Sequence, residues 1–224
     1  AEVQYYTARQ YIERIVELSD APLTEPRPLE QKVLGNCRDH SVLLCALLRR
    51  QGIPARARAG CGAYFIPDHW EDHWICEYWD EEQERWIMVD AQLNPFQCQA
   101  MKITFNPLEV PTDQFWTSGK LWLGARAGEV DPEKCGIFDI HGIGYLRWIV
   151  GLDFGALNKF PVLPWDGWGL FGKEIADITE EDHVFLDELS QKLIDVDEYI
   201  EELHDLFMDD EHVKGTGFQK RVLS

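Results

Sequence analysis

The feature that most constrains the fold is a change in the period of the apolar residues. Residues 38–51 are predicted to form a helix with apolar side chains on nearly every side, and Gly52 then provides a stop signal. Three segments with a period of two follow this helix, as strands have, at 55–65, 73–79 and 85–89. A buried helix followed by such strands predicts an α+β fold, with the helix packed on an antiparallel sheet.

The rest of the chain is predicted to be mostly helical. Thr179 precedes three acidic residues and is a credible N-cap. Helices are expected at 5–18, 113–127, 142–158, 180–194 and 197–208, with an aromatic loop at 158–172. We therefore expect a core at 1–104 and a mostly helical extension at 105–224 packed on it, with acidic helices at 177–211.

The charge is concentrated near the C-terminus. The chain of 224 residues has a formal net charge of -19, and residues 177–211 contain 15 acidic residues but one basic residue, Lys192. Such a balance argues against nucleic acid as a partner. The longest apolar runs, such as 42–48, are too short to span a bilayer, and no signal segment is recognised, so we expect a cytoplasmic protein without a membrane partner.

The cysteines favour reduced thiols. No pair has the C-x-x-C spacing of zinc knuckles or redox motifs. Three disulfides are possible by number, but the six residues are sparse for a disulfide-stapled scaffold, and we expect free, mostly buried thiols. They are Cys37, Cys45, Cys61, Cys76, Cys98 and Cys135.

Three residues suggest nucleophilic catalysis. Cys37 opens the buried helix, where the helix dipole and free N–H groups favour a thiolate. His73, at the start of one predicted strand, could take the thiol proton and later protonate the leaving group. Asp90 ends the next strand and could orient the imidazole, because a tight turn brings both residues toward one edge of the sheet.

The segments around these residues resemble the transglutaminase-like superfamily. The resemblance rests on GNCRDH at 35–40, RRQGIPAR at 49–56, HWICEYW at 73–79 and WIMVD at 86–90. It implies a papain-like core and a Cys-His-Asp triad. Members of this family carry out crosslinking transglutamination, peptide or amide hydrolysis, or bacterial amide-bond synthesis. Residues 105–172 resemble a continuation found in uncharacterised bacterial members.

The resulting expectation is a cysteine-dependent acyl transfer or amide hydrolysis through an acyl-enzyme on Cys37. The acyl donor would be a peptide, amide or thioester, with an amine as a candidate acceptor, and neither a metal nor an organic cofactor is required. A non-catalytic binding module with the same fold is the first alternative. A zinc hydrolase that uses His69 and His73 is the second, although the H-x-x-x-H sequence lacks the glutamate of H-E-x-x-H.

Other side chains could complete the site. The backbone N–H of Cys37 and the side chain of Gln31, six residues earlier, are candidate oxyanion donors. Residues 66–84 contain eight acidic residues and no basic one, so Asp68 and its neighbours could favour a cationic partner, or could simply form a solvated loop. Trp165 could cap a substrate groove or pin the C-terminal helices to the core.

Overall fold

The predicted central helix is present as α2 (Cys37–Arg50). It packs on strands β1 (Ala55–Gly62) and β2 (Trp70–Asp80) in the computed structural model, which describes residues 2–213. The Sγ atoms of Cys45 on α2 and Cys76 on β2 lie 3.2 Å apart at this interface, and all six cysteines are free thiols. The α+β fold class is thereby confirmed.

The sheet has six strands and is mixed. β1 pairs antiparallel with β2 and with β4 (Phe115–Thr117), and β3 (Arg85–Val89) pairs antiparallel with the second half of β2. β5 (Cys135–Ile137) pairs with the start of β2 in parallel and with β6 (Ile140–His141) antiparallel. The expected sheet was wholly antiparallel, so the β2–β5 pair departs from it.

Most predicted helices are present with small shifts in their ends. The helices besides α2 are α1 (Ala8–Leu18), α3 (Pro95–Met101), α4 (Ser118–Arg126), α5 (Ile143–Leu157), α6 (Glu180–Ile194) and α7 (Val196–Asp209). The side chain of Thr179 caps α6 as expected, by accepting from Asp182 N. The segment expected as one helix at 113–127 begins instead with β4, and the part of the predicted extension beyond residue 213 lies outside the described residues.

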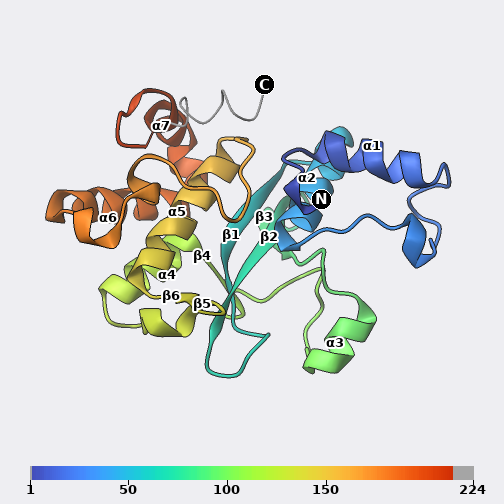
Figure 1. The fold of residues 1–224 in the computed structure, drawn as a ribbon, viewed down its shortest axis with the longest axis horizontal. Coiled ribbons are helices and arrows are strands. Elements are labelled where there is room, and N and C mark those ends of the chain that lie inside the picture. The colour runs from blue at the N-terminus through green and yellow to red at the C-terminus, as the bar shows by residue number, and fades with distance from the viewer. Residues whose placement is uncertain (1, 214–224) are drawn as a thin grey trace.

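The helix α5 covers part of the unpaired edge of β1. Figure 1 shows α4–α7 grouped on one side of the central strands, with α1 and α2 on the other. Because β4 pairs with only the last residues of β1, the backbone N–H of Ala59 has no strand partner and donates to Asp153 Oδ1 of α5 at 3.0 Å. Covering an unpaired edge in this way prevents its pairing with another chain.

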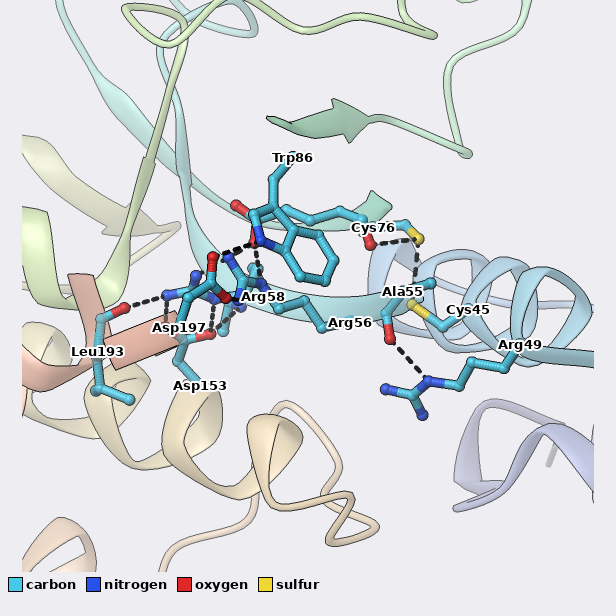
Figure 2. A network of polar contacts seen from close by, with 12 residues as sticks. Cys45, Arg49, Ala55, Arg56, Arg58, Cys76, Trp86, Asp153, Leu193 and Asp197 are labelled. Atoms are coloured by element: carbon cyan, nitrogen blue, oxygen red, sulfur yellow. Dashed lines mark hydrogen bonds and ion pairs between the residues drawn. The ribbon is translucent and has the colours of Figure 1, made fainter. Parts of the chain in front are cut away.

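A buried ionic network joins the two halves of the chain. Arg58 of β1 donates to both carboxylate oxygens of Asp153 at 2.9 Å, to Leu193 O at 2.7 Å and to Glu77 Oε2 at 3.3 Å (Figure 2). Asp153 also accepts from the Ser118 hydroxyl at 2.9 Å. The charges of Arg58 and Asp153 are therefore paired and hydrogen-bonded, as burial requires.

The described helices are not suited to spanning a membrane. Within residues 2–213, none combines the length and the apolar character that a bilayer crossing requires.

Candidate active site

Cys37 occupies the first position of α2. Asn36 caps the helix, because its side chain accepts from Asp39 N at 3.2 Å while the Asp39 carboxylate accepts from Asn36 N at 2.9 Å. This capping box leaves the remaining free N–H groups and the positive end of the helix dipole beside the thiol. Cys37 is half-buried, so its sulfur is held at the surface of the core.

His73 is hydrogen-bonded to Asp90 and interacts with Cys37. Its Nε2 lies 2.8 Å from Asp90 Oδ2, and the Cys37 side chain is close enough to His73 to raise the pKa of the imidazole. His73 was expected at the start of its strand. The strand β2 begins three residues earlier, at Trp70, so His73 lies inside it. Only 2% of His73 is exposed. The ring of Phe65 packs edge-on against the imidazole, with the two ring centroids 4.7 Å apart.

Asp90 follows β3 directly and is fixed by three donors. Besides His73, the Tyr64 hydroxyl donates to its Oδ2 at 2.7 Å, and Gln92 N donates to its Oδ1 at 3.0 Å. Burial alone would raise the pKa of Asp90, but the hydrogen bonds from His73, Tyr64 and Gln92 hold it below its usual value. The carboxylate is therefore an ionised acceptor at neutral pH.

The two partners of His73 determine its charge. Burial by itself would lower the pKa of His73, but the interactions with Asp90 and Cys37 outweigh this effect and raise the pKa to about 10. The imidazole thus carries a proton at neutral pH. A positively charged imidazole beside a sulfur atom stabilises a thiolate, which is the nucleophilic form.

A pocket of about 540 Å³ opens in front of Cys37 and His73. Most of its wall is apolar, with Phe138, Ile140 and Trp148 among the lining side chains. The polar groups besides the two site residues include the carboxyl groups of Glu71 and Asp72. An apolar cavity with a few convergent polar groups is typical of a small-molecule or side-chain binding site.

Residues 5–91 match the family model of the transglutaminase-like superfamily. This segment is a transglutaminase-like domain. Cys37, His73 and Asp90 all lie within it, in the order that the resemblance implied. Neither the curated proteins nor the solved structures contain a match to this chain.

The pocket is shared between the transglutaminase-like domain and the residues that follow it. Cys37, Glu71 and His73 come from the matched segment, whereas Phe138 and Trp165 come from beyond its end. The family match therefore covers Cys37, His73 and Asp90 but leaves out part of the pocket wall, including Phe138 and Trp165.

The structure separates the other predicted site residues. Trp165 lines the Cys37 pocket and is 46% exposed, so it lies where a capping side chain was expected. Gln31 does not line this pocket, but a neighbouring one that extends along α1 and α2. Asp68 also lies outside the Cys37 pocket, since its carboxylate pairs with Lys134 Nζ at 2.5 Å on the surface.

The acidic segment 66–84 does not form one surface. Glu71 and Asp72 line the pocket, and burial raises the pKa of each carboxyl group. Glu77 is instead buried against Arg56 and Arg58. The remaining acidic residues, Asp80, Glu81, Glu82 and Glu84, lie at or beside the β2–β3 turn. Alternation along β2 and pairing with distant residues disperse a cluster that is continuous in the sequence.

His69 contacts a backbone carbonyl and a carboxylate. Its Nε2 lies 3.2 Å from Gly136 O and 3.2 Å from Glu71 Oε2, just before β2 begins. In the described part of the chain, no group of three or more His, Cys, Asp or Glu side chains could hold a metal ion. Residues 2–213 therefore contain no ligand set of the kind that the zinc-hydrolase alternative requires.

Sequence reasoning missed four residues of the site. Tyr64 and Gln92 bind Asp90, while Tyr145 donates to Asp72 Oδ1 at 2.7 Å and Trp148 lines the pocket. The position of Gln92, two residues after Asp90, was the one local signal. Tyr145 and Trp148 lie on a buried helix more than 50 residues downstream of Asp90, where an apolar pattern does not distinguish pocket from core.

Proposed function

We propose that the protein is a cysteine-dependent acyltransferase or amidase in which Cys37 is the nucleophile. The contact of His73 with both Cys37 and Asp90, at the head of a pocket, is the observation that supports this proposal most strongly. Three groups in this order meet the geometric requirement for an activated thiol whose base is oriented by a carboxylate.

The reaction would proceed through a thioester. The Cys37 thiolate attacks the carbonyl carbon of an amide or thioester, and His73 gives its proton to the leaving amine or thiol. Water or a second amine then attacks the acyl group, returns a proton to His73 and releases the sulfur. The N–H of Cys37 would stabilise the developing oxyanion, and the side-chain amide of Gln92, which lines the pocket, is the candidate for a second donor.

Selective alkylation tests the role of Cys37. We expect iodoacetamide to label Cys37 faster than the other five thiols at pH 6–7, because the protonated His73 favours the thiolate. The change Cys37→Ser should abolish this fast phase and the adduct of an acyl-enzyme probe, as read by mass spectrometry.

Cys98 supplies the matched control. It is also half-buried, but it lies on α3 outside the Cys37 pocket, so Cys98→Ser should leave the fast phase intact. Uniformly slow labelling of all six thiols would contradict the proposal and favour a non-catalytic binding module.

The pocket also supports an amine as the acyl acceptor. Glu71 and Asp72 provide carboxyl groups near the site, and Trp148 and Trp165 provide aromatic rings. Carboxylates and aromatic faces both attract an alkylammonium ion. After His73 has given its proton to the leaving group, it could take a proton from the alkylammonium ion and so generate the attacking amine.

Neutralising one carboxyl group tests this specificity. The change Glu71→Gln should raise the KM for an alkylamine acceptor several-fold and leave hydrolysis of the same acyl donor nearly unchanged, because the cationic acceptor loses a partner and the acyl donor does not. Asp68→Asn removes an equal charge outside the pocket and is the control. Equal effects of both variants on amine transfer would argue for bulk charge rather than contact.

A further inference from the structure

A second pocket lies behind the nucleophile helix, and it is lined by cations. It has a volume of about 210 Å³ and shares no lining residue with the Cys37 pocket. Fifteen residues line it, of which Arg38, Arg49 and Lys159 are basic and none is acidic. In a chain with 40 acidic and 21 basic residues, a cavity free of carboxylates is unexpected by composition alone.

The lining residues of α2 form one stripe along the helix. Arg38, Val42, Cys45, Ala46 and Arg49 are spaced at three to four residues, so they share a face. An arginine therefore lies at each end of the stripe, about 16 Å apart along the axis at 1.5 Å per residue, with small and apolar side chains between them. Ala156 and Val162 supply further apolar wall from the other side.

Two of the three cations have no carboxylate partner among residues 2–213. Arg49 uses its Nε to donate to Ala55 O at 2.7 Å, and Figure 2 shows its two terminal nitrogens without a contact to the residues drawn. Lys159 follows α5 closely, is exposed, and makes no ion pair with a described residue. Arg38, in contrast, bonds to the carbonyl groups of Tyr5 and Tyr6 and to Asp39.

Two buried N–H donors of the pocket residues also have no acceptor. Trp74 is 1% exposed and Arg38 is 2% exposed, and neither Trp74 Nε1 nor Arg38 Nε has a hydrogen-bond partner. A buried donor without an acceptor costs about 1–3 kcal/mol, and such atoms commonly mark a missing water or ion. Donors, cations and the absence of acidic groups all call for a ligand that is negatively charged and accepts hydrogen bonds.

We propose that this pocket binds a small organic carboxylate with an apolar body. The carboxylate would pair with Arg49 and Lys159, while its carbon chain would lie along Val42 and Ala46 toward Arg38. Charge-assisted pairs fix such an anion, and the apolar wall distinguishes it from an inorganic one. The site is separate from the proposed chemistry at Cys37.

Binding of hexanoate to the full chain, measured by calorimetry and by the rise in Tm, tests the proposal. A ligand that binds only the folded state stabilises it by RT ln(1 + [L]/Kd), so the Tm rises with the ligand concentration. We expect hexanoate to bind, and inorganic phosphate and hexylamine to bind at least about tenfold more weakly, because phosphate lacks the apolar body and hexylamine has the wrong charge.

Charge variants locate the site. The double change Arg49→Gln and Lys159→Gln should weaken hexanoate binding at least about tenfold, and both side chains are exposed, so the fold should be retained. The control is Arg9→Gln with Lys192→Gln, which changes the net charge equally at distant surface pairs. No binding of hexanoate, equal binding of phosphate or hexylamine, or equal effects of the two double variants would each overturn the proposal.

Discussion

At the scale of single residues, the site depends on a buried histidine that is charged. His73 is almost fully enclosed, which opposes a charge, yet Asp90 and Cys37 keep its proton bound. The pair in turn depends on Tyr64 and Gln92, whose hydrogen bonds keep Asp90 ionised. Each of these groups would be unfavourable in the interior alone, and together they satisfy one another.

The raised pKa of His73 predicts how stability depends on pH. The folded protein holds the proton up to about pH 10, whereas an unfolded histidine loses it near pH 6.5. The unfolded state therefore binds fewer protons between these values, so the stabilisation is complete below about pH 6.5 and is lost as the pH rises toward 10. Above about pH 8.5 an unfolded cysteine is also a thiolate, so Cys37 no longer offsets His73 there, and urea unfolding from pH 8.5 to 10 should show a steeper loss of unfolding free energy in the wild type than in His73→Asn.

An exposed histidine provides the control for that measurement. His141 pairs with Glu133 on the surface, so His141→Asn should leave the pH slope as in the wild type. Parallel slopes for the wild type and His73→Asn would mean that His73 is not protonated in the folded state.

At the scale of elements, the start of α2 couples the stability of a helix to the reactivity of a thiol. The Asn36–Asp39 capping box determines where the helix begins and thus where the Cys37 sulfur lies relative to the helix axis. The same kind of box, Asn94 with Gln97, caps α3; neither residue lines the Cys37 pocket, although Met101 at the other end of α3 does. The two helices therefore form a natural comparison.

Removing each cap should separate stability from reactivity. Both Asn36→Ala and Asn94→Ala should lower the unfolding free energy by about 1 kcal/mol, which is the usual cost of a lost N-cap. Only Asn36→Ala should also slow the alkylation of Cys37, because the helix end would fray beneath the thiol. If Asn94→Ala slowed the alkylation equally, the effect would come from general destabilisation.

The elements themselves were predictable to different degrees. The helices at α2, α5 and α6 and the strands β1 to β3 are long enough to display a period, and their predictions are confirmed. The strands β4, β5 and β6 span two or three residues each, which is too short for alternation to be visible. These strands form through pairing, β4 with β1, β5 with β2 and β6 with β5, and not through local preference.

At the scale of the whole molecule, Arg58 and Asp153 connect the segments before and after residue 104. The bridge spans β1 and α5, and Leu193 of α6 and Ser118 of α4 bond to it as well. The division into a core at 1–104 and an extension at 105–224 stays a prediction. The described parts of both segments contribute strands to one sheet and share this network.

Breaking the network should destabilise the protein strongly. Asp153→Ala would leave Arg58 buried with fewer partners and remove the acceptor of the Ala59 N–H, so we expect a loss of about 3–5 kcal/mol in unfolding free energy. Asp197→Ala, which removes a largely exposed partner of Arg56, should cost less than about 1 kcal/mol. Urea unfolding followed by circular dichroism and tryptophan fluorescence measures both.

A compensating variant makes that prediction stricter. Arg58→Met combined with Asp153→Leu removes both charges and should recover part of the stability lost in Asp153→Ala, since the uncompensated charge is gone. Similar losses for Asp153→Ala and Asp197→Ala would show that burial does not govern this network.

By itself, the sequence determined the central helix, the following strands and the order of Cys37, His73 and Asp90. The period of the apolar residues and the spacing of the motifs are properties of the sequence, so they can be recognised without a structure. Tertiary structure alone decided that Gln31 and Asp68 lie outside the pocket, and that the acidic segment is dispersed. The partners that settle these positions, such as Lys134 for Asp68, are far away in sequence, and their contacts arise only when the chain is folded.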